Sequence, residues 1–183
     1  MELGGFSRIS VVGTSCSGKT TLAVQLARLL DLPYVELDSI YWGPGWRPRP
    51  DFVDQVRLAV SNDRWVIDGN YGMVRSTIWE RAEAVVWLNL PLRIVLSRAI
   101  RRTAQRIRSQ EIVHGNRETL ARAVLDPDGI PWWVLLSHGP RRRKFRRIFR
   151  RRAYPHLTVF ELSSSREVSV LLEWTRRVCG QTR

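Results

Sequence analysis

The stretch "VVGTSCSGKTT", residues 11–21, decides the fold of this chain. It contains Gly13 and, after four residues, Gly18-Lys19-Thr20, which is the spacing of a phosphate-binding loop. The preceding run "RISVVG", residues 8–13, is apolar and rich in β-branched residues, so it predicts a buried strand. Residues 18–30 carry leucine and alanine at helical spacing, so strand, loop and helix follow in the order that the motif requires.

A loop of this kind predicts binding of ATP together with Mg²⁺. Its glycines let backbone N–H groups turn inward around an anion, and the following helix aims its positive end at the same place. We expect Lys19 to bridge the terminal phosphates and Thr20 to help hold Mg²⁺. The predicted nucleotide-binding residues of the loop are Gly13, Thr14, Ser15, Cys16, Ser17, Gly18, Lys19, Thr20 and Thr21.

The rest of the chain alternates between strand and helix patterns. Apolar runs predict further strands at residues 33–37, 64–70, 83–90 and 156–162, and helical periodicity occupies 51–62, 91–107 and 166–178. This alternation indicates a five-stranded parallel sheet in a three-layer α/β/α domain that covers residues 1–183. Between about residues 108 and 155 it lapses, which is typical of a helical lid over an active site.

Two aspartates follow predicted strands, where parallel sheets bind ligands. Asp68 ends the apolar run "WVID" and is placed to hold Mg²⁺, directly or through water; the alternative is a carboxylate that caps a turn. Asp38 follows the second strand. It is equally consistent with a group that orients or deprotonates an acceptor hydroxyl and with the cap of a helix or turn.

Aromatic residues follow the same two strands. Flat rings beside a phosphate site suit an acceptor that contains a ring, and they are equally what a loop uses to pack onto its own domain. For Tyr41 the packing role is favoured. The aromatic candidates are Tyr41, Trp42, Trp46 and Tyr71.

Arginine dominates the second half of the chain, which has a net charge of +14 over residues 92–183 against −1 over residues 1–91. Arg98 and Arg102 share a helix face that is able to close on ATP or to remain in solvent. Residues 141–152, "RRRKFRRIFRRR", predict a basic amphipathic helix docked by Phe145, Ile148 and Phe149. That helix suits a transferring phosphate, a nucleic-acid backbone or an acidic membrane surface.

The composition favours a globular protein over a disordered, membrane-spanning or secreted one. Hydrophobic residues make up 44% and charged residues 26% of the 183 residues, a globular balance. No apolar run approaches the roughly 20 residues that span a bilayer, and residues 1–10 do not read as a secretory signal. Two cysteines form no disulfide framework, so we expect a cytoplasmic protein. The three histidines match no metal-ligand spacing.

The combination of "GTSCSGKTTLAVQLA" (13–27), "LD" at Asp38, "GW" (45–46), "WVIDGNY" (65–71) and "HGNRE" (114–118) resembles the DNA topology modulation protein family of adenylate-kinase-like P-loop proteins. This resemblance runs along nearly the whole chain. It implies the nucleoside monophosphate kinase fold, with sheet order 2-3-1-4-5 and a mobile lid. It also implies that Arg98 stacks on adenine and that Arg102 contacts phosphate.

One departure concerns the acceptor. In adenylate kinases an arginine that grips the acceptor phosphate closely follows the strand-ending Asp-Gly, whereas here Asn70 and Tyr71 follow and the next arginine is Arg75. This departure counts against AMP as the acceptor. The leading hypothesis is a small-molecule or nucleoside monophosphate kinase in which Lys19, Asp38, Asp68 and Arg102 serve catalysis. The alternatives are a nucleic-acid-associated ATPase that uses residues 141–152 and a nucleotide-binding regulator without turnover.

Overall fold

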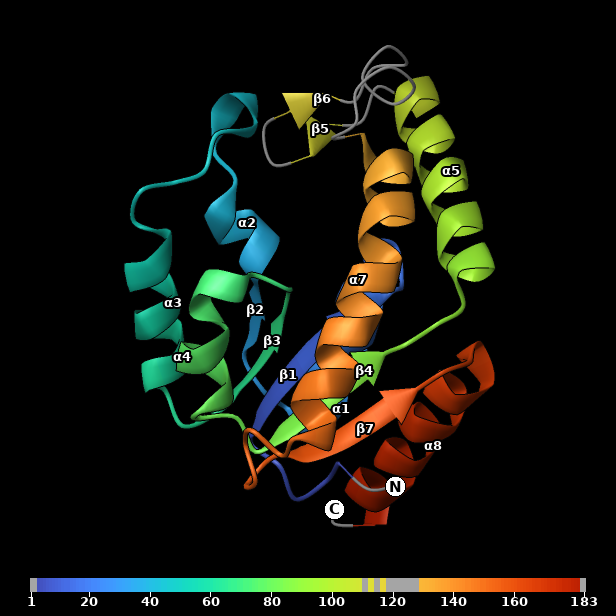
Figure 1. Ribbon diagram of the computed structural model, residues 1–183. Helices are drawn as coiled ribbons and strands as arrows, with labels where there is room; N and C mark the ends of the chain where they lie inside the picture. Colours follow the sequence, from blue (N-terminus) through green and yellow to red (C-terminus); the bar gives the residue numbers. More distant parts are fainter. Residues whose placement is uncertain (1–2, 110–111, 114–115, 118–128, 182–183) are drawn as a thin grey trace.

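Five parallel strands form the central sheet of the computed structural model, which describes residues 3–109, 112–113, 116–117 and 129–181. The strand order is β2-β3-β1-β4-β7, so the predicted order 2-3-1-4-5 is confirmed (Figure 1). The strands are β1 Arg8–Gly13, β2 Tyr34–Glu36, β3 Trp65–Asp68, β4 Ala84–Leu88 and β7 Thr158–Leu162. All four neighbouring pairs are parallel, so the carboxyl ends of the strands lie along one edge of the sheet.

Helices cover both faces of the sheet, as the sequence predicts. On one face lie α1 (Lys19–Leu30) and α8 (Ser165–Gln181), which pack against each other. The other face carries α3 (Phe52–Ser61), α4 (Arg75–Trp79) and α7 (Ile130–Arg150), and α5 (Leu92–Ser109) packs beside α7. The shorter elements are α2 Leu37–Tyr41, η1 Pro44–Trp46, η2 Gly72–Val74, β5 Ile112–Val113 and β6 Asn116–Arg117.

Strand β1 shows how the sequence builds these layers. Ile9 and Val11 point into the core beneath α1 and α8, whereas Val12 points into the core beneath α3, α4 and α7. Alternate residues of a strand face opposite sides, and both sides are covered here. Burial of the apolar residues Ile9, Val11 and Val12 contributes the hydrophobic part of the strand's stability. The buried Ser10 hydroxyl between them accepts a hydrogen bond from the Trp79 Nε1 at 3.2 Å.

Helix α7 lies within the range predicted for the lid, about residues 108–155. It begins at Ile130, continues through Pro140 and ends at Arg150, so it is longer than the predicted helix of residues 141–152. Phe145 is buried against the sheet, and Ile148 and Phe149 pack on the same core, which confirms the predicted docking face. The C-terminal half of α7 is therefore part of the domain body.

The prediction of one domain with a lid stays a prediction for the remainder of that range. The short antiparallel pair β5–β6 lies within it and was not predicted from the sequence. Of the "HGNRE" motif, Asn116 and Arg117 form β6, and residues 114–115 and 118 lie outside the described residues. Over the described ranges, no helix combines the length and apolar character needed to cross a membrane.

Candidate nucleotide-binding and acceptor site

The P-loop leaves the carboxyl end of β1 and leads directly into α1. Gly18, which precedes the helix, has φ = 98°, in the left-handed region that favours glycine. At Gly13 a Cβ atom would lie 2.8 Å from the carbonyl oxygen of Leu88 on the neighbouring strand. Glycine is therefore required at the first position because β4 packs closely against the loop.

Two polar side chains of the loop, Lys19 and Ser17, have few or no partners among the described residues. The Lys19 Nζ lies 3.4 Å from the carbonyl oxygen of Thr14, and within the described part of the chain it forms no ion pair with a carboxylate. The hydroxyl of Ser17 is buried and has no hydrogen-bond partner among the described atoms. A cationic side chain and an unsatisfied hydroxyl in one loop are suited to receive an anion.

Asp68 is the most buried carboxylate of this edge, with 2% of its surface exposed. Its oxygens accept hydrogen bonds from the Thr20 hydroxyl at 2.7 Å and from the Tyr34 hydroxyl at 3.1 Å. Burial raises the pKa of Asp68, although the Thr20 hydrogen bond and the charge of Lys19 oppose that shift. The structure thus joins the two residues predicted to hold Mg²⁺, and it adds Tyr34, which the sequence analysis did not single out.

Asn70 connects the loops that follow β1 and β3. The backbone N–H of Gly13 donates to the Asn70 Oδ1 at 3.2 Å, and the Asn70 Nδ2 donates to the carbonyl oxygen of Gly13. Gly69 beside it has φ = 145°, and a Cβ atom there would lie 2.7 Å from the Leu37 side chain. Asn70 and Gly69 of the "WVIDGNY" motif therefore fix the P-loop against β3. The sequence analysis did not predict this role.

Arg98 bridges the P-loop and the start of α8. Its Nη1 donates to the carbonyl oxygen of Ser17 at 2.9 Å, and its Nη2 donates to the Ser165 hydroxyl at 3.0 Å. Beside it lies a cavity of about 290 Å³ that opens onto the loop. The residues lining it include Gly18, Thr21, Gln25, Leu90, Arg98 and Val168. Arg98 thus lies at this cavity and not on a solvated helix face.

Arg102 and Arg106 continue the same face of α5 toward Cys16. Burial raises the pKa of the Cys16 thiol, and the charge of Arg102, a hydrogen bond from it and the charge of Arg106 oppose the shift. Arg102 is exposed, whereas Arg106 is 6% exposed. Arg106 was not a predicted site residue; its spacing of four residues from Arg102 is the signal that could have identified it.

Asp38 lies just after β2 at the carboxyl end of the sheet, in the first turn of the short helix α2 and one residue beyond the predicted strand. It is exposed, and its Oδ1 accepts a hydrogen bond of 2.6 Å from the Tyr71 hydroxyl. The charge of Asp38 contributes to the raised pKa of Asp68, so the two carboxylates belong to one electrostatic site. Burial and the adjacent Asp38 raise the pKa of Tyr71.

The four aromatic candidates form one chain of contacting rings, in which Tyr41 and Trp42 lie 4.7 Å apart between centroids. The rings of Tyr41 and Tyr71 lie 4.3 Å apart between centroids, and those of Trp42 and Trp46 lie 5.7 Å apart. Tyr41 also packs edge-on against Phe52 of α3, as expected for a core role. Of the four, Tyr71 is the one whose polar atom reaches Asp38.

The fold is shared with small-molecule kinases of known structure. Shikimate kinase from Acinetobacter baumannii, solved with shikimate, matches at a TM-score of 0.54 and 15% identity over 98% of this chain and 92% of that chain. A gluconokinase from Sinorhizobium meliloti 1021 matches at 0.52 and 14% identity, covering 96% and 93% of the two chains. Shikimate kinase from Aquifex aeolicus matches at 0.51 and 15%, covering 96% and 97%.

These likenesses define the class by its fold, the P-loop kinase-like α/β/α fold. No protein-family model matches the sequence. No curated protein matches it either.

Proposed function

We propose that this protein is an ATP-dependent phosphotransferase that acts on a small hydroxylated molecule. The observation that carries the proposal is the hydrogen-bonded pair Thr20–Asp68 directly beneath the P-loop. A buried carboxylate that accepts from the hydroxyl at this loop position gives the oxygen ligands that Mg²⁺ prefers, at the place where the phosphates of ATP are expected.

The remaining groups of the site fit MgATP. Lys19 lies at the loop with its charge unpaired by any described carboxylate, and the Ser17 hydroxyl is buried without a partner. Arg98 borders the cavity beside the loop, where the adenosine part would lie. Mg²⁺ would supply a Lewis acid that neutralises charge on the phosphates.

The acceptor would approach from the side of Asp38 and Tyr71. In the proposed step, an acceptor hydroxyl attacks the γ-phosphorus, its proton passes to Asp38, and the bond to the β-phosphate oxygen breaks to release ADP. Lys19 and Arg102 would stabilise the charge that develops on the transferred group. Positioning and charge neutralisation would supply most of the rate enhancement.

Two similarities to known proteins support the proposed phosphotransferase. The structurally similar proteins are, by their names, kinases of gluconate and shikimate, which are small molecules. The resemblance of the "WVIDGNY" motif to the DNA topology modulation protein family is part of the same proposal, and within this chain Asn70 of that motif holds Gly13. A cytoplasmic location, where ATP is abundant, belongs to the same proposal.

A second candidate function is binding of a polyanion such as nucleic acid. It rests on the exposed basic residues of α7, which lie on the side of the helix away from Phe145. These residues are Arg143, Lys144, Arg146, Arg147 and Arg150. Binding of duplex DNA that weakens steeply with salt and is lost when these charges are removed would support it. Salt-insensitive or absent binding would exclude it.

The test of the leading proposal is formation of ADP from MgATP, with and without a panel of sugars, sugar acids, nucleosides and nucleoside monophosphates. We expect ADP formation to rise with one acceptor and to disappear in Lys19→Ala. The matched control is Lys144→Ala, because Lys144 is the other lysine of the chain and lies exposed on α7. ADP formation that is indifferent to every acceptor would contradict a kinase.

A further inference from the structure

Two arginines from distant parts of the chain approach each other on the acceptor side of the site. Arg75 opens helix α4, and Arg141 lies in the middle of α7. The Arg75 guanidinium lies over the ring of Phe145, which is one helical turn from Arg141 on α7, so the two arginines lie near each other. Arg75 lines a small cavity together with Tyr71, whose hydroxyl donates to Asp38, so the pair lies beside the proposed acceptor hydroxyl site.

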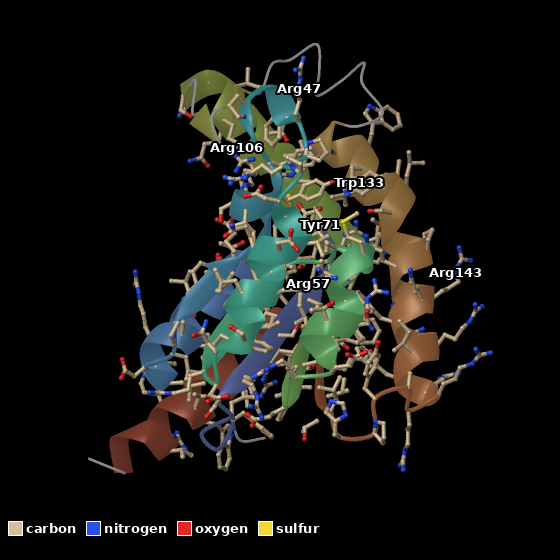
Figure 2. The ribbon with its side chains drawn as sticks, turned by 90° about the vertical axis from the view of Figure 1, so that its left-hand side faces the viewer. Arg47, Arg57, Tyr71, Arg106, Trp133 and Arg143 are labelled. Atoms are coloured by element: carbon tan, nitrogen blue, oxygen red, sulfur yellow. The ribbon has the colours of Figure 1, made fainter. Side chains whose placement is uncertain are left out.

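Aromatic rings hold both guanidinium groups. The Arg75 guanidinium lies 5.6 Å from the ring centroid of Trp79 and 5.4 Å from that of Phe145. Arg141 lies 5.3 Å from the ring centroid of Trp133, and Figure 2 shows Trp133 and Tyr71 at the same end of the molecule. Rings restrict the guanidinium planes and limit their hydration, so each charge is positioned before a ligand arrives.

Within the described part of the chain neither guanidinium forms an ion pair, although Arg8, Arg49, Arg57 and Arg81 all do. Both groups are partly withdrawn from water, and burial lowers the pKa of each. Burial and the like charge of Arg75 both disfavour the charged form of Arg141, and the charge of Asp38 offsets part of this cost. Binding of an anion would remove both the repulsion and the unsatisfied donors.

Arg75 also borders a narrow cavity that continues from the acceptor side into the domain. Asn70, Tyr71, Trp79 and Phe145 line it together with Arg75. Arg143, only two residues beyond Arg141, points away from the body of the molecule in Figure 2. The basic stretch of residues 141–152 is therefore divided, with Arg141 directed to the site and its neighbour directed to solvent.

We propose that the acceptor is a small hydroxylated acid whose anionic group binds between Arg75 and Arg141 while its hydroxyl faces Asp38. This inference rests on the proposed function and adds the chemical class of the acceptor. A carboxylate and a phosphate monoester share the planar or forked oxygen pair that guanidinium groups bind, so both sources fit the site. Neutral sugars and nucleosides do not.

The test is equilibrium binding of matched pairs of compounds, one acidic and one neutral. Gluconate with glucose supplies a carboxylate, and AMP with adenosine supplies a phosphate. Quenching of tryptophan fluorescence reports binding, because Trp79 and Trp133 contact the two guanidinium groups. We expect an acid to bind and its neutral counterpart to bind at least about 10-fold more weakly, in line with loss of charge-assisted hydrogen bonds.

Variants then assign the binding to the arginine pair. Arg141→Gln should weaken binding of the acid about 10- to 100-fold, Arg141→Lys should recover part of it, and Arg143→Gln should leave it unchanged. Equal binding of acid and neutral compound, no binding of any acid, or equal loss in Arg143→Gln would overturn the proposal. Arg75→Gln is a less direct variant because Arg75 packs between two rings.

The same samples separate this inference from the proposed function. ATP binding and ADP formation are measured independently of acid binding. An acid that binds through Arg141 but never stimulates ADP formation would contradict the phosphotransferase and leave the anion site intact. A neutral compound that is phosphorylated would contradict the acid and leave the phosphotransferase intact.

Discussion

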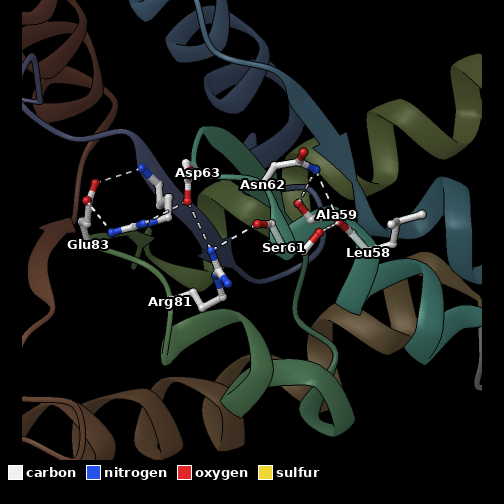
Figure 3. Close-up of polar contacts among 8 residues, drawn as sticks. Leu58, Ala59, Ser61, Asn62, Asp63, Arg81 and Glu83 are labelled. Atoms are coloured by element: carbon white, nitrogen blue, oxygen red, sulfur yellow. Dashed lines mark hydrogen bonds and ion pairs between the residues drawn. The ribbon is translucent and has the colours of Figure 1, made fainter.

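The two ends of the central sheet carry similar charges in opposite arrangements. At the amino end, Glu83 accepts hydrogen bonds from the backbone N–H groups of Ser7 and Arg8 at 2.7 Å and 3.0 Å and pairs with the Arg8 guanidinium at 2.7 Å. Asp63 adds contacts to Arg8 and Arg81, so these charges neutralise one another (Figure 3). They connect the starts of β1, β3 and β4.

At the carboxyl end, the basic groups do not pair with carboxylates in the same way. Lys19 and Arg98 donate to backbone carbonyl oxygens of the P-loop, and Asp68 accepts from two hydroxyls. Charges at the amino end are therefore satisfied within the protein and stabilise the fold, whereas under the proposed function those at the carboxyl end would bind MgATP and an acceptor. Substitutions at the two ends should therefore have opposite signatures.

The largest expected effect is at Lys19. Lys19→Ala should reduce phosphoryl transfer about 1000-fold or more, because the variant loses the charge that neutralises the transferring group. The melting temperature should change little, since within the described residues Lys19 makes one long hydrogen bond to its own loop. Steady-state kinetics measures the rate of transfer, and thermal melting measures the stability of the variant. A Lys19→Ala variant with a clearly lower melting temperature but an unchanged rate of transfer would contradict the difference proposed between the two ends of the sheet.

Asp68 should show the next largest effect. Asp68→Asn should lower transfer about 100-fold and weaken its dependence on Mg²⁺, because the neutral amide is a poorer ligand. Titration of Mg²⁺ against rate is the measurement, and chelation of the metal should abolish activity in the wild type. Asp63→Asn, at the other end of the sheet, is the control and should leave the Mg²⁺ titration unchanged.

Asp68 also gives a pH dependence of stability. Its pKa is raised in the folded state, so its contribution to stability is present in full below the ordinary carboxyl pKa and is lost as pH rises through the raised pKa. Urea unfolding without Mg²⁺ should therefore show wild type losing stability relative to Asp68→Asn as pH increases across that window. A difference that grows in the opposite direction would contradict a carboxylate destabilised by burial.

A smaller effect is expected at Arg98. Arg98→Ala should raise the KM for ATP about 10-fold with a lesser change in kcat, because it removes a side chain that borders the cavity beside the loop. Arg101→Ala is the matched control, since Arg101 is exposed on the same helix. Equal KM values for ATP in the two variants would show that Arg98 does not contribute to ATP binding.

The smallest effect on catalysis is expected at Glu83. Glu83→Ala should lower the free energy of unfolding by about 2 kcal/mol, because it leaves two backbone N–H groups and one guanidinium without their acceptor. The kinetic constants should stay within about twofold of wild type, and Glu80→Ala, which removes an exposed carboxylate, serves as the control. Loss of phosphoryl transfer in Glu83→Ala without loss of stability would contradict a purely structural role for the charges at the amino end of the sheet.

Sequence reasoning predicted the strands and the P-loop because both depend on local signals, namely apolar periodicity and fixed glycine spacing, whereas the sheet order came from the family resemblance. It did not find Tyr34, Asn70 or Arg106 as site residues, since each acts on a residue far away in the sequence. The division between Arg141 and Arg143 follows from the predicted docking face, because Arg141 lies one helical turn from Phe145 and Arg143 does not. Sequence reasoning gave no sign that Arg75, distant in the sequence, packs on the same Phe145 ring.

The most direct test of the central claim is the fate of the γ-phosphate. The purified protein is incubated with Mg²⁺ and γ-labelled ATP in the presence of the acid that binds most tightly in the fluorescence titration. The account predicts that the label enters a new phosphorylated compound in a one-to-one ratio with ADP, and that Lys19→Ala forms neither. Label that appears only as inorganic phosphate, at a rate unchanged by the acid, would contradict it.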